Sequence, residues 1–330
     1  MAVTNPLQVM PSMEGDLARV ESGLLDAVRS ADPFLTEIAS HLISAGGKRV
    51  RPGFSIAAAA TASRTDAPAS TDAVTGAVAV ELVHLGSLYH DDVMDEAVVR
   101  RTVDSVNARW GNHKAILAGD YLLAKASELA SSLGVEVASL LARTIARLCE
   151  GQLLELRHSF DTTRTEESYL QAIEGKTASL LGTSCRIGGL VADIPTPHTD
   201  ALTTFGHSYG MAFQIVDDVL DLVATEEELG KPAGHDIEEG VYTLPVLYTL
   251  EGPHGAELRA LLGGPVEPEA RARAIEIVRE GDGIARAIRL AAEFADRGRE
   301  ALRTLPDSPG VVGLWAAADY LLDSVEAAAA

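Results

Sequence analysis

The chain is short of cysteine, and this shortage excludes disulfide scaffolds and cysteine-based metal sites. Only Cys149 and Cys185 occur among the 330 residues. Two cysteines are too few for a disulfide framework, and these two lack the close spacing of zinc ligands. We therefore expect two buried thiols without a chemical role, in the reducing environment of the cytoplasm.

Basic residues are also scarce. The sequence has 27 of them against 48 acidic residues, which gives a formal net charge of -21. A charge of this size and sign repels polyphosphate backbones and anionic lipids, so it disfavours nucleic acid binding and electrostatic membrane docking. Any phosphate-bearing ligand must then bind where basic residues are locally concentrated.

Long apolar runs are absent as well. No uncharged apolar run reaches the roughly 18–20 residues that a membrane-spanning helix needs. The N-terminal stretch MAVTNPLQVMPSMEGD does not have a basic segment followed by an apolar one, which is the pattern of a signal peptide. We therefore expect no membrane span and a cytoplasmic location.

Proline and strand signals are missing from the centre of the chain. No proline occurs between Pro68 and Pro195, and apolar residues recur there at intervals of three and four. Sustained polar and apolar alternation and Asn-Gly or Asp-Gly hairpin signals are absent. The sequence predicts an all-α fold, with long helices over residues 70–95, 135–157 and 199–223. Without repeats or a true linker, it predicts one domain over residues 1–330.

One motif, D-D-x-x-D, occurs twice. The first copy is Asp91, Asp92 and Asp95, and the second is Asp217, Asp218 and Asp221. On a helix the first and last aspartates of each copy lie one turn apart and project to nearly the same side. Like charges at this spacing cost a few tenths of a kcal/mol, and a helix C-terminus disfavours negative charge further. A bound cation would remove both costs.

The chemistry of the two clusters favours Mg²⁺. Oxygen ligands without neighbouring histidine or cysteine ligands select a hard cation, and Mg²⁺ binds one or two carboxylates together with water and substrate phosphates. Two clusters therefore predict a metal-bridged diphosphate between two helices. The alternative is a solvated acidic surface. It fits less well, because the apolar stretches AVTGAVAVELVHLGSL and TTFGHSYGMAFQIV precede the clusters and predict buried helices.

Cations that could meet a diphosphate gather in three short places: the stretch GGKRVRP at residues 46–52, Arg100-Arg101, and Lys176-Thr177. The first can end one helix and start the next while it presents Lys48 and Arg51 to phosphate oxygens. A capping turn with solvated cations is the alternative. A Walker A loop is excluded for EGKT, because Leu170 occupies the position of its first glycine and no strand precedes it.

Two histidines accompany the first cluster. His84 precedes Asp91 by seven residues and so faces the same side of the helix, although a lone histidine on an apolar helix is usually a core residue. His90 directly precedes Asp91, which permits a rival interpretation as a helical metal-dependent phosphohydrolase. That enzyme class needs further histidine ligands, and it leaves the second cluster unexplained.

Seven motifs in order resemble the trans (E)-polyprenyl diphosphate synthase family. They are GGKRVRP, HLGSLYHDDVMDEAVVRR, NHKAILAGDYLLA, GQLLEL, GKTASLLG, FQIVDDVLD and ELGKPAGHDIEEGVYTLP. Class I terpene cyclases also carry one D-D-x-x-D, but they pair it with a different second motif. The resemblance implies an all-α helical bundle around a deep central cavity, and a homodimer.

The resemblance also implies residue roles. Asp91, Asp95 and Asp217 would bind Mg²⁺ directly, with Asp92, Asp218 and Asp221 in support. Isopentenyl diphosphate would be held by Lys48, Arg51, His84 and Arg101. The allylic diphosphate, from farnesyl or geranylgeranyl diphosphate, would be held by Arg100, Lys176, Thr177, Gln214 and Lys231. Lys176, Thr177 and Gln214 would be the catalytic residues nearest the reacting carbons.

The sequence departs from the family in two places. The frequent Gly-Lys-x-Thr-Leu-Pro appears as Gly240-Val241-Tyr242-Thr243-Leu244-Pro245, so one usual diphosphate-facing lysine is absent. Alanines replace the basic C-terminal residue of many relatives. Neither departure removes a predicted metal ligand.

Product length depends, by resemblance, on the residues before the first motif. A bulky aromatic at the fifth position before it marks short-chain synthases, and here that position is Gly86. Val83 and Ser87 are also modest in size, so the sequence predicts a medium- or long-chain product, hexaprenyl or longer. The alternative role for Gly86 is to allow close helix packing.

The predicted activity is therefore a Mg²⁺-dependent prenyl transfer. Isopentenyl diphosphate would condense successively with an allylic diphosphate to give an all-trans polyprenyl diphosphate. Two alternatives stay open: a non-catalytic or regulatory subunit of a heteromeric synthase, and a shorter-chain farnesyl or geranylgeranyl diphosphate synthase.

Overall fold

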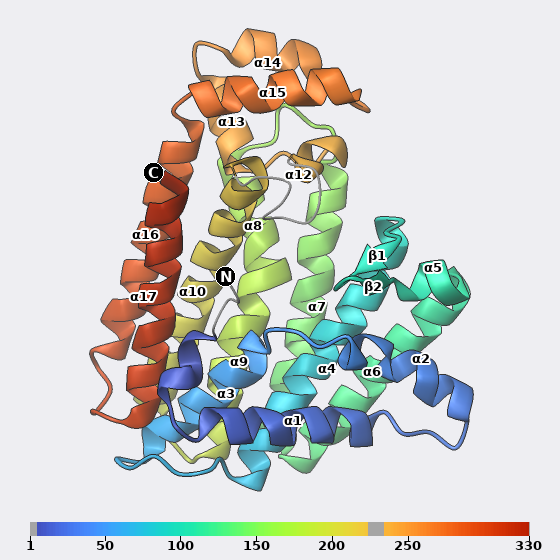
Figure 1. Cartoon of the computed structure of the whole chain (residues 1–330). Helices are drawn as coiled ribbons and strands as arrows, with labels where there is room; N and C mark the ends of the chain where they lie inside the picture. The colour runs from blue at the N-terminus through green and yellow to red at the C-terminus, as the bar shows by residue number, and fades with distance from the viewer. Residues whose placement is uncertain (1–4, 224–233, 330) are drawn as a thin grey trace. The chain divides into compact units, whose positions relative to one another are not determined.

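A computed structural model describes residues 5–223 and 234–329, with side chains to residue 324. Helices make up most of these ranges, and within them strands are confined to β1 (Val99–Arg100) and β2 (Val103–Asp104). The prediction of an all-α fold is confirmed (Figure 1). No helix in the described ranges combines the length and the apolar character that a membrane crossing requires.

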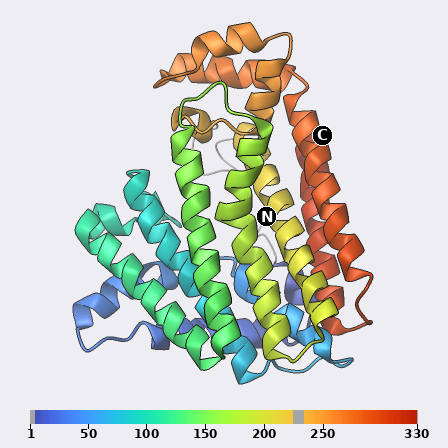
Figure 2. The same ribbon diagram turned by 180° about the vertical axis from the view of Figure 1, so that it is seen from behind.

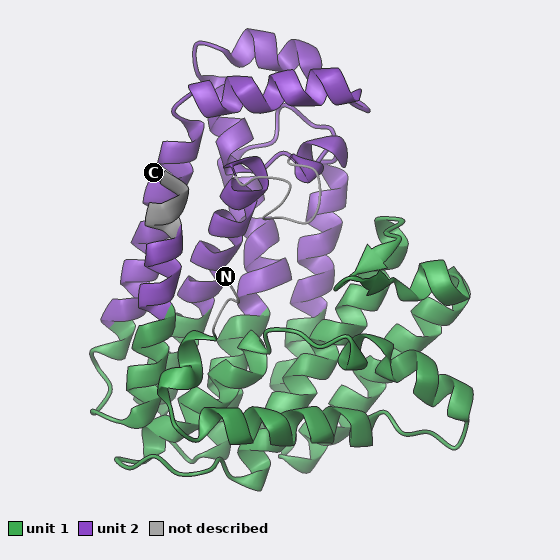
Figure 3. Ribbon diagram, in the orientation of Figure 1, with its two compact units in different colours: residues 1–145, 180–206, 301–317 green, residues 146–179, 207–300, 318–330 purple. Residues whose placement is uncertain are grey.

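The chain divides into two compact units, coloured separately in Figure 3. Unit 1 comprises residues 1–145, 180–206 and 301–317, and unit 2 comprises residues 146–179, 207–300 and 318–330. The first D-D-x-x-D belongs to unit 1 and the second to unit 2. The single domain over residues 1–330 stays a prediction.

The helices that begin in unit 1 include the long α4, which carries the first aspartate cluster. They are η1 (Pro6–Val9), α1 (Met13–Ala27), α2 (Pro33–Ser44), α3 (Val50–Ala59), η2 (Ala60–Ala62), α4 (Thr71–Met94), α5 (Val106–Trp110), α6 (Asn112–Ser132), α7 (Val135–Arg157), α10 (Thr196–Val223) and α17 (Pro309–Ala329). Helix α9 (Ser179–Val191) lies in unit 1 except for its first residue.

Helix α4 is the central element of unit 1. The Ser70 hydroxyl caps its first turn by accepting a hydrogen bond from the Ala73 amide (3.1 Å). Its apolar side chains are buried on all sides, which is the pattern of an interior helix. Burial of Leu82 or Leu85 contributes about 1.5–3 kcal/mol each. Helices α1, α3 and α6 pack against it, and Figure 2 shows α6 along α4 from behind.

A short hairpin follows α4. Val99 pairs with Asp104 and Arg100 with Val103 in antiparallel register. Arg101 and Thr102 form its turn, and both have positive φ angles (52° and 65°), as a type I′ turn requires. Left-handed non-glycine residues cost of order 1–3 kcal/mol each. The sequence contains no Asn-Gly or Asp-Gly signal here, so this hairpin was not predicted from the sequence.

Unit 2 contains the later parts of α7 and α10 and the elements that pack on them. These are α8 (Glu166–Ile173), the π-helical turn η3 (Glu174–Ala178), α12 (His235–Glu238), α13 (Leu244–Glu251), α14 (Gly255–Leu261), α15 (Pro268–Glu280) and most of α16 (Gly283–Leu302). Tyr169, Ile215 and Tyr242 are among its fully buried side chains. Of these, Tyr169 contacts the second aspartate cluster, because its hydroxyl donates a hydrogen bond to Asp218.

Candidate active site

The first aspartate cluster closes the C-terminal end of α4. Asp92 is fully buried, and its Oδ1 accepts a hydrogen bond from Nε of Arg100 (2.7 Å) and forms an ion pair with Nη2 of the same arginine (2.6 Å). Burial raises the pKa of Asp92, and the Arg100 guanidinium opposes that rise. Asp91 is half-buried and Asp95 exposed. The cluster therefore offers two accessible carboxylates beside one that is tied to an arginine.

Buried charges gather on the N-terminal side of this cluster, around Glu81 on α4. Glu81 is 2% exposed and accepts a hydrogen bond from Nη1 of Arg49 (2.8 Å). Nη2 of Arg101 lies 3.8 Å from the same carboxylate oxygen. Nε of Arg51 is buried and has no hydrogen-bond partner among the described residues. Glu81 thus pairs with Arg49 and Arg101, and its charge also acts on Arg51.

The predicted isopentenyl diphosphate residue His84 faces these arginines. Its pKa is lowered well below the ordinary value, first by burial and then by the charges of Arg51, Arg101, Arg49 and Arg100. A neutral imidazole can donate one hydrogen bond and accept another without adding to the positive charge. Unit 1 therefore brings together three of the four residues predicted to hold this substrate: Arg51, His84 and Arg101.

The glycines of the GGKRVRP stretch allow the loop to approach Arg101. Gly46 and Gly47 have φ angles of 82° and 151°. A Cβ on Gly47 would lie 2.9 Å from the Arg101 guanidinium carbon. Arg101 donates hydrogen bonds to the carbonyls of Gly46 and Leu42, the latter at 3.1 Å. The loop therefore both separates two helices and fixes a predicted substrate cation.

Lys48 and Arg49 have different environments within this loop. Lys48 is exposed, and its carbonyl accepts a hydrogen bond from the Asn5 side chain (3.3 Å). Arg49 is 4% exposed, and its Nε and Nη2 bind the two oxygens of Glu21. Lys48 is therefore placed to meet a ligand from solvent, and Arg49 is a structural ion-pair residue.

The predicted chain-length residues face different directions. Gly86 is buried toward α6, where an added Cβ would lie 3.1 Å from the Gly119 carbonyl oxygen and 3.1 Å from Leu123 Cγ. The contact supports the close-packing role for Gly86. Ser87 is half-buried and donates a hydrogen bond to the His84 carbonyl (2.9 Å), while Val83 is buried.

His90 lies against α6. Its Nε2 is 3.2 Å from the Ile116 carbonyl oxygen and 3.4 Å from an Asp120 carboxylate oxygen. A Cβ on Gly119 would overlap the imidazole ring. Across the described ranges, no group of three or more histidine, cysteine or acidic side chains is arranged to hold a metal ion. These contacts do not support the phosphohydrolase interpretation.

The second aspartate cluster is linked to predicted catalytic residues by hydrogen bonds. The Asp218 carboxylate is buried and accepts from the Tyr169 hydroxyl through Oδ2 (2.5 Å) and from Gln214 Nε2 through Oδ1 (2.8 Å). Gln214 Oε1 in turn accepts from the Thr177 hydroxyl (2.8 Å). Burial raises the pKa of Asp218, and the bonds from Tyr169 and Gln214 oppose the rise.

Asp217 and Asp221 complete this cluster. Asp217 is exposed, while Asp221 is 5% exposed and its Oδ2 accepts a hydrogen bond from the Asp236 amide (3.3 Å). The carbonyl of Asp221 accepts from the Gly234 amide (2.8 Å). Lys231 lies outside the described residues.

Lys176 is positioned by close contact between two glycines. A Cβ on Gly175 would lie 2.9 Å from the Gly151 Cα, so this approach of the π-helical turn to α7 requires glycine. The approach places the Lys176 ammonium 2.5 Å from Glu155 Oε1. A π-helical turn frequently marks a functional site. Here it carries both Lys176 and Thr177.

Several charged or polar residues of these clusters were missed by the sequence analysis: Glu81, Glu155, Arg164 and Tyr169. Each is an ordinary helix or loop residue in the sequence, and only burial beside an opposite charge or a carboxylate distinguishes it. Glu155 lies within the GQLLEL motif, which was the one available signal for it.

The carboxylates fit a hard divalent cation that binds together with a phosphate-bearing substrate. Oδ2 of Asp92 is buried and lacks a hydrogen-bond partner within the described part of the chain. Mg²⁺ does not require a complete protein cage, because it takes most of its ligands from water and phosphates. In unit 1 Asp91 and Asp95 are accessible to such an ion, and in unit 2 Asp217 is.

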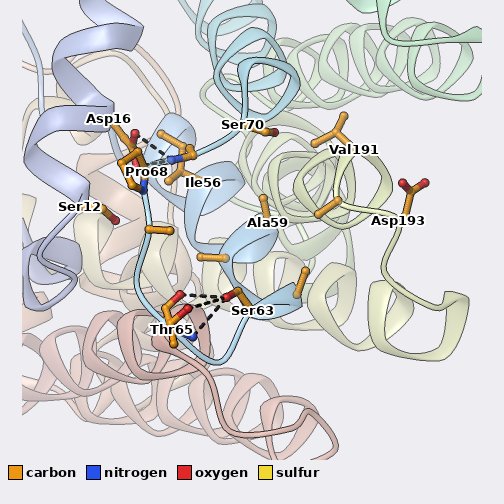
Figure 4. A pocket seen from close by; sticks show the side chains of 15 residues that line it. Ser12, Asp16, Ile56, Ala59, Ser63, Thr65, Pro68, Ser70, Val191 and Asp193 are labelled. Carbon is orange, nitrogen blue, oxygen red and sulfur yellow. Dashed lines mark hydrogen bonds between the residues drawn. The ribbon is translucent and has the colours of Figure 1, made fainter.

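Two cavities lie apart from the predicted residues. One of about 320 Å³ in unit 1 is bordered by α1, α3 and the loop before α4. Figure 4 shows Ser12, Ile56 and Val191 around it. The other, of about 580 Å³, lies in unit 2 between α8, α10 and α16. No predicted site residue lines either cavity.

Comparison with known proteins identifies the class of this chain. A family model described as Polyprenyl synthetase matches residues 32–279. Nonaprenyl diphosphate synthase from Mycobacterium tuberculosis is 45% identical over 312 residues, which are 94% of this chain and 92% of that protein.

Solved structures agree with this match. A decaprenyl diphosphate synthase from Rhodobacter capsulatus has a TM-score of 0.89 and 32% identity, covering 96% of this chain and 98% of that one. A polyprenyl synthase from Caulobacter crescentus, complexed with calcium and isoprenyl diphosphate, has a TM-score of 0.88 and 32% identity, covering 96% of each chain. The family match and the fold thus define a prenyl-transferring enzyme. The chain belongs to the polyprenyl synthetase family.

Proposed function

We propose that this protein condenses isopentenyl diphosphate successively with an allylic diphosphate and releases an all-trans polyprenyl diphosphate of hexaprenyl length or longer. The observation that carries the proposal is the gathering of Arg51, Arg101 and His84 around Glu81, on the helix α4 that also carries Asp91 and Asp92, in a chain with a net charge of -21. So local a concentration of positive charge suits an anionic substrate.

The reaction begins with cleavage of the C–O bond of the allylic diphosphate. The bonding electrons leave with the diphosphate and an allyl cation remains. The double bond of isopentenyl diphosphate attacks this cation, a new C–C bond forms, and a proton is lost from the adjacent carbon. Charge develops on the leaving diphosphate, so stabilisation there lowers the barrier. Mg²⁺ bound by the aspartates would neutralise part of that charge.

The residues of unit 2 suit the cleavage step. Lys176 would hold the leaving diphosphate, and its pairing with Glu155 fixes its position. Thr177 and Gln214 present oxygen dipoles, and these stabilise a nearby cation without capturing it as a strong nucleophile would. The departing diphosphate can accept the proton, so no separate protein base is required.

The residues of unit 1 suit the second substrate. Lys48, Arg51 and Arg101 would bind the diphosphate of isopentenyl diphosphate, which does not leave during the reaction. His84 would donate one hydrogen bond to it. Asp91, Asp95 and Asp217 would supply the carboxylate ligands of the Mg²⁺ ions, with Asp92, Asp218 and Asp221 in support.

The names of two relatives and the small side chain of Ser87 support the proposal of a long product. The similar proteins from Mycobacterium tuberculosis and Rhodobacter capsulatus are named as nonaprenyl and decaprenyl diphosphate synthases. Ser87 lies one helical turn before Asp91 and is small, so it does not obstruct a tail on the aspartate side of α4. The relatives' names and the open face of α4 at Ser87 both favour a product of hexaprenyl length or longer.

One incubation tests this function. Purified protein alone would receive Mg²⁺, farnesyl diphosphate and labelled isopentenyl diphosphate, and chromatography would size the dephosphorylated products. We expect labelled products of hexaprenyl length or longer. Folded protein without extractable product would favour the regulatory subunit, and products that end at farnesyl or geranylgeranyl length would favour a shorter-chain synthase.

We also propose a cytoplasmic homodimer. Ile116 and Leu117 on α6 are 42% and 65% exposed, and large apolar side chains at these exposures favour a partner surface. The thiol of Cys185 is buried and its pKa is raised by burial, which suits a reduced thiol in the cytoplasm. Cys149 is exposed, so the expectation of two buried thiols was wrong for Cys149. Sedimentation of wild type and Leu117→Glu would test the dimer, because the added charge should shift the protein to monomer.

A further inference from the structure

Arg164 is a buried cation whose hydrogen bonds are incomplete. It lies between α7 and α8 and is 5% exposed. Nη1 donates to the Tyr242 carbonyl (3.3 Å), and the guanidinium carbon lies 5.5 Å from the centre of the Tyr169 ring. Nε and Nη2 are buried and have no hydrogen-bond partner among residues 5–223 and 234–324. A buried donor left unpaired disfavours the folded state.

The two unpaired nitrogens form one edge of the guanidinium. N–H groups on Nε and Nη2 point in parallel, and this edge binds two oxygen atoms of one carboxylate or phosphate. Arg49 uses the same two atoms to hold both oxygens of Glu21. Arg164 therefore keeps open the edge that is best suited to an oxyanion.

The acidic neighbours of Arg164 are already committed to other partners. Glu155 is bound by Lys176. Asp218 accepts hydrogen bonds from Tyr169 and Gln214. The Asp161 carboxylate accepts a hydrogen bond from the Thr163 hydroxyl (2.6 Å) and lies 2.8 Å from Nδ1 of His158. All three carboxylates act on Arg164 through charge, but none is hydrogen-bonded to its Nε or Nη2. The oxyanion that fits the open edge must therefore come from outside these groups.

The segment that carries Arg164 is fixed to the stretch that departs from the family motif. The Phe160 amide donates to the Gly240 carbonyl (2.8 Å), and Arg164 donates to the carbonyl of Tyr242. These two bonds flank Val241, which stands where the motif GKxTLP has lysine. A cation from another segment is thus held beside the position at which this chain lacks one.

We propose that Arg164 is a substrate-binding residue whose Nε and Nη2 bind two oxygen atoms of the allylic diphosphate. The inference rests on the proposed prenyl transfer. Both nitrogens are covered in this structure, so the segment between α7 and α8 must shift when the anion binds. Arg164 and Lys176 then contact the same leaving group, on which negative charge grows during C–O cleavage.

The test uses three variants of the full chain. Arg164→Met removes the charge and keeps much of the volume, whereas Arg164→Lys keeps the charge without the paired N–H groups. Arg286→Met is the matched control, because Arg286 also packs on a tyrosine ring (3.8 Å, Tyr248) and contacts a carboxylate (3.2 Å, Glu251) in unit 2. Calorimetry would measure binding of inorganic pyrophosphate with Mg²⁺, and steady-state kinetics would give the KM of each substrate.

We expect Arg164→Met to weaken pyrophosphate binding and to raise the KM of farnesyl diphosphate by about tenfold or more, since each lost bond to a charged group is worth at least one factor of ten. The KM of isopentenyl diphosphate should stay within about twofold of wild type. For Arg164→Lys, the KM of farnesyl diphosphate should lie between the values of wild type and Arg164→Met. For Arg286→Met, both KM values should match those of wild type. If Arg164→Met does not fold, the two KM values and the pyrophosphate affinity of Arg164→Lys are compared with those of wild type instead.

Two results would overturn the role of Arg164 while leaving the proposed function intact: an active wild type with Arg164→Met indistinguishable from Arg286→Met, or both KM values rising equally along with a lower Tm. The second result would mean that Arg164 has only a structural role. A wild type that neither makes product nor binds pyrophosphate would instead refute the proposed function itself.

Discussion

Arg100 holds Asp92 through two nitrogen atoms that contact a single carboxylate oxygen, Oδ1, at 2.7 and 2.6 Å. The other oxygen, Oδ2, is buried without a hydrogen-bond partner among the described residues. The pair joins the end of α4 to the hairpin that follows it. Its geometry assigns Asp92 to holding the cluster together and leaves Asp91 and Asp95 on the accessible side.

Breaking this pair on one side should destabilise the protein. Arg100→Met leaves a carboxylate buried and unpaired, and because Arg100 itself is 33% exposed the loss should be no more than about 3–5 kcal/mol. Asp92→Asn with Arg100→Met should recover a large part of that loss, because no charge then remains buried. Urea unfolding of the two single variants and the double variant would give the coupling energy. Coupling near zero would show that Arg100 does not stabilise Asp92.

The accessible aspartates should behave in the opposite way. Asp91→Ala and Asp217→Ala each relieve repulsion on a helix and remove a carboxylate from a predicted metal site. We expect turnover to fall by several orders of magnitude, with the Tm unchanged or higher. Differential scanning calorimetry beside product assays would show whether both effects occur. Near wild-type turnover in either variant would remove the metal clamp from the mechanism.

The sequence predicted helix boundaries well where a capping residue, a glycine or a proline marks them. The helices expected at residues 70–95 and 135–157 were found as α4 (Thr71–Met94) and α7 (Val135–Arg157), because Ser70 and Gly134 are strong local boundaries. Helix α10 begins at Thr196, directly after Pro195, three residues earlier than expected. Where a capping residue or a proline fixes a helix boundary, the sequence alone is sufficient to predict that boundary.

The arrangement of charges was less predictable than the motifs. Nothing in the letters Arg101-Thr102 indicates a turn with two positive φ angles, since asparagine and glycine usually occupy it. The partners of Glu81 come from segments 32 and 20 residues away, counted from Arg49 and Arg101. Such pairings depend on packing between helices, so the sequence could identify the cations but not the acids that hold them.

The two lysines of the site should differ in their kinetic effect. Lys48→Ala removes an exposed cation and should raise the KM of isopentenyl diphosphate, with kcat little changed. Lys176→Ala should lower kcat as well, because only the allylic diphosphate leaves and Lys176 is assigned to it. Separate titration of the two substrates distinguishes these outcomes. Equal changes for both substrates in both variants would show that the two diphosphate sites were divided wrongly.

Metal and diphosphate should stabilise the protein cooperatively. No complete metal cage is present among the described residues, so Mg²⁺ should bind weakly until phosphate oxygens supply further ligands. We expect inorganic pyrophosphate with Mg²⁺ to raise the Tm more than the sum of their separate effects, because binding to the folded state stabilises it. EDTA should abolish product formation, and added Mg²⁺ should restore it. Strictly additive Tm shifts would mean that the two ligands bind independently.

Product length should respond to Ser87 rather than to Gly86. Ser87 precedes Asp91 by one helical turn and lies on the same side of α4, whereas Gly86 is rotated by about 140° from Asp91. An added Cβ on Gly86 meets the Gly119 carbonyl and Leu123, so Gly86→Phe should force α4 and α6 apart and lower the Tm. Ser87→Phe should instead place a ring below the aspartates and shorten the products, with the first condensation retained. Chromatography of dephosphorylated products, with Ser87→Ala as the control, would check this. Unchanged products from an active Ser87→Phe variant would show that the growing tail does not follow this face of α4.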